Sequence, residues 1–466
     1  MTPEEALSKS VAEVAPEIQS RRLSPVALAE ASLAGLETEG RTLNAVATVT
    51  RERALEDARA AESEIAAGRY RGPLHGIPYG AKDLLATKGV PTTWGARPLV
   101  RQVIDEDATV IRRLREAGAV LVAKLAMIEL AGGLGYNTAA ASSTGPAKNP
   151  WDPTRWTCGS SSGSGAATAA GLVGFSIGSE TWGSILCPSA FTGVTGLRPT
   201  YGLVPRTGAM ALSWTMDKIG PMARSAEDCG LVLDAIAGHD PGDPSSLDVP
   251  SPKSATSPDA RSWRIGAIRP SFEKFGHREI EAAFDEAVKT LGGLGARVSD
   301  AKLPDLPFDE TAILIIVVEA AAAFEPLITS GRVRELNEPS VAASAEAAKR
   351  VSGVDYVRAM QARRIMQQEL AKVLESYDLL VSPTVPMLAT KLSDKLEAAF
   401  AYSDPLGSGS NLAGLPALSA PCGFSKSGLP IGMQIVGPPL SESRVLALGR
   451  FYQENTEWHT RQPPIP

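Results

Sequence analysis

Apolar residues follow helical spacing in several segments, and short apolar runs follow each of those segments. In SPVALAEASLAGLETEG (24–40), Ser24 is predicted to cap a helix that begins at Pro25. In DATVIRRLREAGAVLVAKL (107–125), Asp107 is predicted to cap a helix, Gly118 to end it, and AVLVA to form a buried strand. This order of helix and strand predicts an α/β protein.

The same order of elements recurs in two further segments. Residues 166–172 predict a helix followed by a strand at 173–178, and residues 278–298 predict a helix that leads into a strand. Short strands without polar alternation are buried on both faces, so we predict a mostly buried, largely parallel or mixed sheet. Residues 3–67 are predicted to be helical, and the Ala-rich segment 309–360 to form helices over one edge of the sheet.

One change of composition divides the chain of 466 residues. Residues 240–262, DPGDPSSLDVPSPKSATSPDARS, are rich in Pro, Ser and Asp. This composition predicts a surface loop between an N-terminal half and a C-terminal half.

The overall composition is that of an ordinary globular protein, with 44% hydrophobic and 21% charged residues. The net charge is −6 and no long basic run occurs, so neither nucleic acid nor a membrane surface is an expected partner. The start, MTPEEALSKS, is too acidic and polar for a secretory signal. The longest apolar run, AILIIVV (312–318), is too short to span a bilayer. We therefore expect a cytoplasmic protein.

The cysteines and histidines argue against a metal site and against a disulfide framework. The four cysteines lie far apart without a C-x-x-C pair, which predicts reduced thiols: Cys158, Cys187, Cys229 and Cys422. The histidines show no metal-ligand spacing: His75, His239, His277 and His459. No metal and no cofactor are expected.

A first candidate nucleophile is Ser161, because GSSSG (159–163) matches the G-x-S-x-G elbow of α/β-hydrolases. Such an elbow requires a strand directly before the serine. Here the preceding NPWDPTRWTC contains two prolines and predicts a turn-rich approach instead. This argues against the elbow, and an esterase that uses Ser161 and a histidine is kept as an alternative to the amidase.

Lys82, in HGIPYGAKDLLATKG, is a candidate base. An amine in apolar surroundings loses solvation of its charged form, which lowers its pKa. A pKa near 7 needs a shift of about three units, or about 4 kcal/mol of differential solvation. The alternative is a surface lysine paired with Asp83, with only its stem against apolar surface. Composition alone favours this alternative.

The segment GSETWGSILCPSAFTG (178–193) follows a predicted strand and places Ser184 directly after a glycine. In such a turn, successive backbone N–H groups can converge on one point, as an oxyanion hole requires. The alternative is an ordinary polar turn.

These segments together resemble the amidase signature family. The long run GSSSGSGAATAAGLVGFSIGSETWGSILCPSAFTGVTGLRPTYGLVPRTG is similar to the signature of that family. GIPYGAKD, NPWDPTRW, MDKIGPMARSAED and NLAGLPALSAPCGF resemble further family segments in the expected order. The resemblance is weakest over 240–400.

The resemblance implies a single domain over 1–466, built on one large mixed sheet with helices on both faces. Its parts would be an N-terminal helical segment, a signature core with the catalytic residues, the surface loop, a variable substrate-side region and the C-terminal part of the core (1–67, 68–239, 240–262, 263–400 and 401–466).

The family's catalytic residues are a Ser-Ser-Lys triad, which the motifs place at Ser184 (nucleophile), Ser160 (bridging serine) and Lys82 (base). The resemblance implies a cis peptide bond between Gly159 and Ser160. Neutral Lys82 would accept a proton from Ser160, which would take one from Ser184 before an acyl-enzyme forms. The resemblance also implies an oxyanion hole from the backbone of Thr181, Trp182, Gly183 and Ser184, and substrate contacts from Gly132, Gly133, Trp182 and Leu186.

Three departures from the family pattern bear on the substrate. Trp182 stands where a glycine is common, Glu180 where an aspartate is usual, and Leu186 where several members have an arginine. An arginine there can pair with a substrate carboxylate, so Leu186 argues against acidic substrates and glutamine.

We therefore predict a stand-alone serine amidohydrolase, a monomer or homodimer, that cleaves neutral, apolar or aryl amides. Esters and carbamates (urethanes) are predicted further small-molecule substrates. The alternative within the superfamily is the A subunit of a glutamyl-tRNA amidotransferase, which would need partner subunits.

Overall fold

An eleven-stranded mixed sheet runs through the chain in the computed structural model, which describes residues 1–250, 260–270 and 277–464. In order across the sheet, the strands are β1 (Val46–Val49), β3 (Val120–Leu125), β2 (Pro78–Lys82), β6 (Phe175–Glu180), β8 (Lys218–Ala223), β7 (Thr195–Arg198), β12 (Ala417–Phe424), β13 (Pro430–Val436), β11 (Leu379–Pro383), β9 (Arg264–Ile268) and β10 (Arg297–Ala301). A separate pair is formed by β4 (Lys148–Asn149) and β5 (Asp152–Trp156).

Strand directions in the sheet are mixed. Strand β2 is parallel to both of its neighbours, β3 and β6, whereas β6 is antiparallel to β8. The predicted mixed sheet is therefore confirmed. The parallel pairing places the carboxyl ends of β2 and β6 at the same edge, where Lys82 and Glu180 lie.

Helices precede or follow most strands. They are α1 (Pro3–Leu7), α2 (Val11–Gln19), α3 (Pro25–Thr42), α4 (Arg51–Ala66), α5 (Thr109–Glu116), α6 (Ser162–Ala169), α7 (Leu186–Thr192), α8 (Ala226–Ile236), α10 (Arg278–Gly293), α11 (Phe308–Ala323), α12 (Glu325–Thr329), α13 (Val341–Ala348), α14 (Gly353–Ser376), α15 (Leu396–Ala399), α16 (Pro405–Leu412) and α17 (Glu442–Glu454). Short 3-10 helices are η1 (Arg97–Leu99), η2 (Glu129–Gly132), η3 (Arg332–Glu335) and η4 (Trp458–Thr460).

Helices cover both faces of the sheet, as alternate residues of β3 show. Leu121 packs in one core cluster with Ile111 of α5, whereas Val120 and Val122 pack in another with Leu33 of α3. Successive side chains of a strand point to opposite faces, so two separate cores form. The expected helix-flanked sheet is confirmed.

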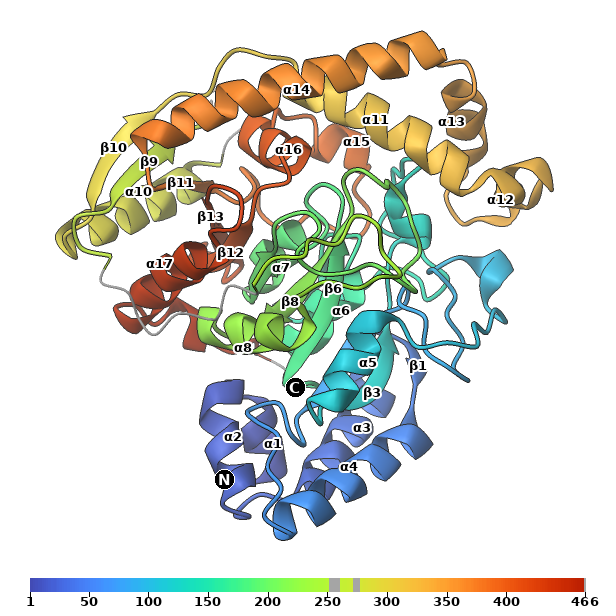
Figure 1. The fold of residues 1–466 in the computed structure, drawn as a ribbon, viewed down its shortest axis with the longest axis vertical. Coiled ribbons are helices and arrows are strands. Elements are labelled where there is room, and N and C mark those ends of the chain that lie inside the picture. The colour runs from blue at the N-terminus through green and yellow to red at the C-terminus, as the bar shows by residue number, and fades with distance from the viewer. Residues whose placement is uncertain (251–259, 271–276, 465–466) are drawn as a thin grey trace.

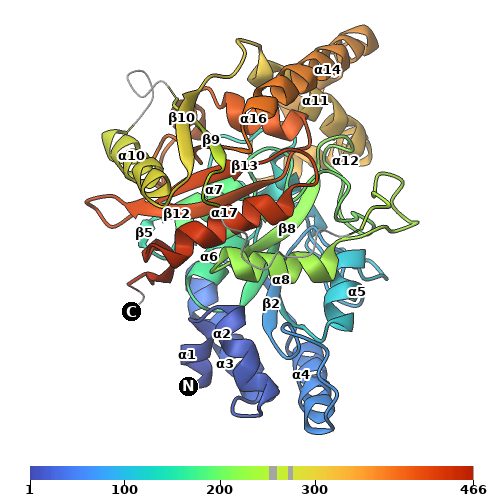
Figure 2. The same cartoon turned by 60° about the vertical axis from the view of Figure 1, so that its left-hand side comes forward.

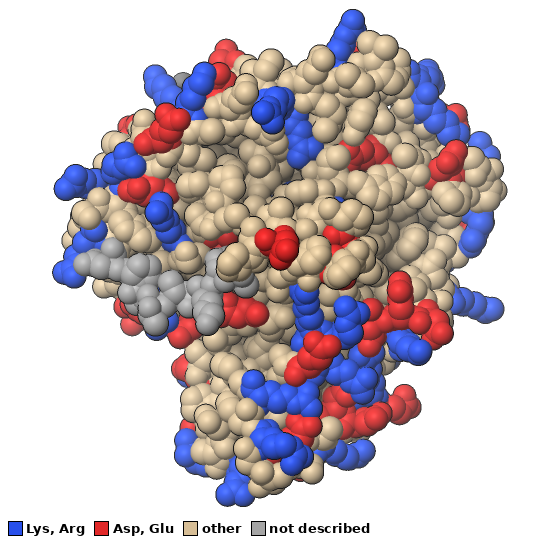
Figure 3. Space-filling view, viewed as in Figure 1, with Lys and Arg blue, Asp and Glu red and all other residues tan. Residues whose placement is uncertain are grey.

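The arrangement in space is visible in Figures 1 and 2. The N-terminal helices α1 to α4 lie at one end of the molecule, and α11 and α14 run side by side over the other end. The Ala-rich segment 309–360 is helical, as predicted. Positive and negative side chains are interspersed over the lower part of the face in Figure 3. Among the described helices, none has the length and apolarity needed to cross a bilayer.

Two local predictions need correction. The predicted all-helical segment 3–67 contains strand β1, which pairs with β3 at the edge of the sheet. Asp107 does not cap α5; its carboxylate instead pairs with Arg53 and accepts the Lys88 N–H. The Ser24 cap is confirmed, since its hydroxyl accepts the Ala27 N–H at 3.1 Å.

The predicted loop at 240–262 lies partly outside the described residues, which omit 251–259. Its described parts, 240–250 and 260–262, contain no helix or strand. Within it, Asp240 and Asp243 accept hydrogen bonds from the neighbouring backbone.

Candidate active site

Lys82 is the last residue of β2, and its side chain is completely buried. Its Nζ lies 2.7 Å from Ser160 Oγ and 3.0 Å from Ser179 Oγ. The neighbouring carboxylate of Asp83 instead pairs with Lys124, at 3.1 Å. The alternative in which Lys82 is a surface residue paired with Asp83 is therefore wrong.

The surroundings of Lys82 make its amine a base near neutral pH. Burial lowers the pKa of Lys82 to about 7, against the opposing effect of the negative charges of Asp217 and Glu180. An amine with such a pKa is substantially neutral at physiological pH, so it can accept a proton from the hydroxyl that it contacts.

The loop that carries Ser160 is held by backbone contacts and contains the cis peptide bond Gly159–Ser160 that the resemblance implied. The Ser160 carbonyl accepts the Ile128 N–H at 3.1 Å. At Gly163, in the first turn of α6, an added Cβ would lie 2.3 Å from the Ala45 carbonyl oxygen. The small residues of this segment therefore allow close approach of backbones, which explains its linker-like composition.

Ser161 does not form the hydrolase elbow that its motif suggested. Its hydroxyl is buried and donates to the Ser179 carbonyl at 3.2 Å, and its N–H donates to the Ser184 carbonyl at 3.3 Å. Within the described residues, no histidine bonds to it; His75 accepts the Arg71 N–H. The arrangement does not assemble a Ser161–His pair.

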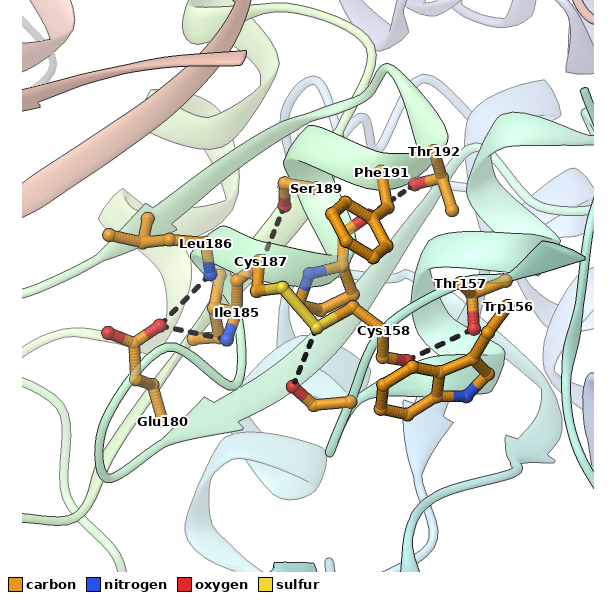
Figure 4. Close-up of a disulfide and its surroundings, with 12 residues drawn as sticks. Trp156, Thr157, Cys158, Glu180, Ile185, Leu186, Cys187, Ser189, Phe191 and Thr192 are labelled. Atoms are coloured by element: carbon orange, nitrogen blue, oxygen red, sulfur yellow. Dashed lines mark hydrogen bonds between the residues drawn. A yellow bond between two sulfur atoms is a disulfide. The ribbon is translucent and has the colours of Figure 1, made fainter. Parts of the chain in front are cut away.

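Glu180 fixes the turn that leads through Ser184 into α7, as Figure 4 shows. One carboxylate oxygen accepts the N–H groups of Ile185 and Leu186 at 2.8 and 3.0 Å. The other accepts from Arg198 at 2.8 Å. Burial acts to raise the pKa of Glu180, but the charges of Arg198 and Lys218 outweigh it and hold the pKa at about 2. The carboxylate therefore remains ionised.

The same turn presents unpartnered backbone donors. The N–H groups of Trp182, Gly183 and Ser184 donate to no acceptor among the described residues. Gly183 has a φ of +77°, which a side chain would disfavour. The Thr181 hydroxyl donates to Asp217 at 2.5 Å, which anchors the start of the turn. Such free donors on a rigid turn can stabilise an oxyanion.

A cavity of about 410 Å³ opens over this turn. Gly159 and Gly183 line it, so it lies against both serine-bearing segments. Among the residues expected to bind substrate, the lining includes Gly132, Trp182 and Leu186. Gly133 is not part of it: a Cβ there would meet Leu212 and Ala320. The rest of the wall includes aliphatic, aromatic, charged and amide side chains, among them Ile313, Val385, Leu396, Tyr136, Phe400, Tyr402, Arg198, Glu397, Asp404, Asn411 and Gln434.

Asp404 is a cavity residue that the sequence reasoning missed. Its carboxylate caps α16 by accepting the Gly407 N–H, and it accepts the Trp182 indole N–H at 3.1 Å. Burial raises the pKa of Asp404 to about 7. The SDPLG segment carries the signal of a helix start, an aspartate before a proline, but not its place beside Trp182.

The prediction that all four cysteines are reduced is wrong. Cys158 and Cys187 form a disulfide across a sequence separation of 29, while Cys229 and Cys422 are free and buried. The fold brings the Ser160 loop against the first turn of α7, which their distance in sequence did not indicate. In the described parts of the chain, no three His, Cys, Asp or Glu side chains are arranged to hold a metal ion.

The comparisons with known proteins agree with this geometry. The Amidase family model matches residues 27–446. The chain belongs to the amidase signature family. A solved amidase of similar fold is the native peptide amidase from Stenotrophomonas maltophilia, with a TM-score of 0.86, 30% identity and 98% of each chain covered.

Two other relatives of the present chain share a different name. The A subunit of glutamyl-tRNA(Gln) amidotransferase from Moorella thermoacetica is 39% identical over 449 residues, 91% of each chain. The structure of the same subunit from Thermotoga maritima has a TM-score of 0.77 and 28% identity, with 100% of this chain and 98% of that chain covered. The family and these relatives establish an enzyme that acts on amide C–N bonds.

These relatives overturn two predictions. Near-full-length relatives at up to 39% identity are named as subunits of an amidotransferase, so the prediction of a stand-alone hydrolase of neutral, apolar or aryl amides is wrong. The predicted partners, a small molecule alone, no nucleic acid, and a monomer or homodimer, are wrong for the same reason. The leucine at position 186 was not sufficient to argue against glutamine, because other charged groups line the cavity, Arg198 and Asp404 among them.

Proposed function

We propose that this protein is the amide-cleaving A subunit of a tRNA-dependent amidotransferase. It releases ammonia from glutamine, and partner subunits use that ammonia to amidate a glutamyl group carried on tRNA. The support is the 39% identity to the Moorella protein over 91% of both chains, together with the buried Lys82–Ser160 pair at the cavity.

In this proposal, Ser184 is the nucleophile, and Lys82 acts on it through Ser160. Neutral Lys82 takes the Ser160 proton, Ser160 takes that of Ser184, and Ser184 Oγ bonds to the amide carbon. The N–H groups of the 181–184 turn stabilise the oxyanion. As the C–N bond breaks, Ser160 returns a proton to the leaving nitrogen, and ammonia departs. Water then cleaves the acyl ester and releases glutamate.

The observation that best supports glutamine as the substrate is the acidic group in the cavity wall. Glutamine has an ammonium group, which an apolar or aryl amide lacks. Asp404 is half-buried, and its carboxyl group lines the cavity beside Trp182. A bound cation favours the ionised carboxylate, so ammonium binding compensates for the burial that raises its pKa.

The first test measures ammonia released from glutamine by the purified protein and by its complex with co-purified subunits. We expect glutamine turnover that Ser184→Ala abolishes and that Ser162→Ala retains. Ser162 is a matched control, because it is the first residue of α6, two positions after Ser160, and its hydroxyl faces the Ala126 carbonyl. Cleavage of an apolar anilide with no turnover of glutamine, alone or in the complex, would contradict the proposal.

The second test concerns the partners. Affinity purification of the tagged chain from its native cells is expected to recover further subunits in fixed stoichiometry. That complex is expected to convert glutamate on tRNA to glutamine at the expense of free glutamine. Recovery of the chain alone, fully active on glutamine, would contradict the assignment to a multi-subunit enzyme.

A further inference from the structure

The Cys158–Cys187 disulfide lies between the two serine-bearing segments of the site. Cys158 directly precedes the Gly159–Ser160 bond, and Cys187 lies three residues after Ser184. Both cysteines are at least 95% buried, and both line the cavity beside Gly159 and Gly183. Figure 4 shows the bond reaching from the 156–158 segment to the start of α7.

Each cysteine is closely coupled to a catalytic element. The Cys187 N–H donates to the Gly183 carbonyl at 2.8 Å, so a movement of Cys187 is transmitted to the turn with Ser184. Cys158 has a φ of +65° and adjoins the segment that presents Ser160 to Lys82. The bond therefore joins the proton-accepting side of the site to the nucleophile side.

Other contacts hold these segments together without the bond. The Asn149 side chain donates to the carbonyls of Trp156 and Phe191, at 3.4 and 2.8 Å. Trp156 and Phe191 also belong to one buried apolar cluster. The fold is therefore expected to survive reduction, whereas the alignment of two hydroxyls, which must agree within a fraction of an ångström, is more easily lost.

We propose that Cys158 and Cys187 are positioning residues, and that their disulfide is a thiol-sensitive crosslink that keeps Ser160 in line with Ser184. This inference rests on the proposed function only for the roles of these two serines. Reduction of the bond slows acylation of Ser184, and re-formation of the bond restores it.

The chemistry needs a thiol co-reactant. A thiolate of a small dithiol attacks one cysteine sulfur, the Cys158–Cys187 bond breaks, and a mixed disulfide forms. The second thiol of the reagent then attacks the reagent sulfur of this mixed disulfide. The cysteine bound there is released, and the reagent becomes a cyclic disulfide. Two electrons and two protons pass to the protein, which then holds two thiols. Oxidised glutathione reverses the change by the same exchange.

Because both cysteines line the cavity, an occupant of the cavity is expected to slow the reduction.

The state of the bond is measured first by alkylating the denatured protein with iodoacetamide. Without reductant we expect two labels, on Cys229 and Cys422, and after reduction four. Four labels without reductant would overturn the inference. Incubation of the folded protein with glutamine is expected to slow reduction by dithiothreitol several-fold. The same protection should be absent after heat denaturation.

The decisive measurement is the rate at which a serine-directed sulfonyl fluoride modifies Ser184, followed by mass spectrometry in oxidised and reduced protein. We expect the rate to fall roughly ten- to a hundred-fold on reduction and to recover with oxidised glutathione. Circular dichroism and the melting temperature check that the protein stays folded. Ser184→Ala identifies the labelled residue.

Variants separate this effect from general destabilisation. The double variant Cys158→Ala/Cys187→Ala is expected to label slowly and to be insensitive to dithiothreitol, whereas Cys229→Ala keeps the wild-type response. Equal labelling rates in both redox states of folded protein would overturn this inference alone. An absence of Ser184 labelling in either state would overturn the proposed function, and the inference with it.

Discussion

The amine of Lys82 lies 2.7 Å from the hydroxyl of Ser160, while the carboxylate of the next residue, Asp83, is bonded to Lys124. Two lysines on neighbouring strands are thus fully buried, and they differ in their partners. Lys124 has an ion pair, whereas Lys82 has hydroxyl and carbonyl groups and no carboxylate within ion-pair distance among the described residues. Lys82 is therefore free to exchange a proton during a reaction.

Replacement of Lys82 by methionine tests its role as the base. We expect Lys82→Met to lower kcat by about 10²- to 10⁴-fold, since a general base contributes on that scale. The melting temperature should stay level or rise, because methionine fills a similar volume without a buried amine. The measurement pairs glutamine turnover with thermal unfolding.

Lys124→Met is the matched control for the first prediction. It leaves the buried carboxylate of Asp83 without its cation, which is expected to cost roughly 3–5 kcal/mol of unfolding free energy. If Lys124→Met abolished turnover at full stability while Lys82→Met retained it, the assignment of the base would be wrong.

The pH dependence of catalysis follows from the pKa of about 7 at Lys82. Only the neutral amine accepts a proton, so kcat/KM should rise with pH through about 7. Asp217→Asn removes a negative charge that raises the pKa of Lys82, so the acidic limb is expected to shift to lower pH. The exposed Asp248→Asn serves as the control and should leave the limb in place. A profile that does not change between pH 6 and 8 contradicts this prediction.

Glu180 couples stability to acid pH. Its pKa of about 2 in the folded protein lies below the ordinary value of 4.5, so its contribution is complete above about 4.5 and is lost as pH falls toward 2. Glu180→Gln leaves Arg198 without its counter-charge, which is expected to lower the free energy of unfolding by roughly 3–5 kcal/mol near neutral pH. The difference in this free energy between wild type and variant should become smaller below pH 4.5. Urea unfolding across pH 2.5 to 7 measures it, and a constant difference would count against the ion pair.

The Trp182–Asp404 contact is expected to control substrate size and binding. Trp182→Phe keeps a ring in the cavity but removes the N–H that binds Asp404, so mainly KM for glutamine should change. Trp182→Gly opens the cavity. The ratio of kcat/KM for γ-glutamyl p-nitroanilide to kcat/KM for glutamine should then increase. Equal effects of both variants on the two substrates would exclude a role of ring size.

The sequence predicted those features of the fold that depend on local order. Apolar spacing, Ser24 before Pro25, and the helix-to-strand order are set by neighbouring residues, and these elements are present. Strand β1 was missed because VATV (46–49) is short and only half-buried, between two long helices. Motif resemblance located Lys82 next to Ser160, a contact across 78 positions that periodicity cannot supply.

The cavity wall was predicted less well, because it is assembled from segments far apart in the chain. Asp404 and Trp182 are separated by 222 positions, and Cys158 and Cys187 meet only after α6 and β6 have packed. The inference from Leu186 failed for the same reason. One side chain cannot define the charge of a wall to which distant residues contribute.

The complete enclosure of Lys82 also determines how it meets reagents. A lysine that is half deprotonated at neutral pH is normally the first to be acylated by an activated ester added to a protein solution. Here the approach to the nitrogen is closed by Ser160 and Ser179, so such a reagent should modify the ordinary surface lysines first. High intrinsic reactivity at this position is reserved for proton exchange with its two hydroxyl neighbours.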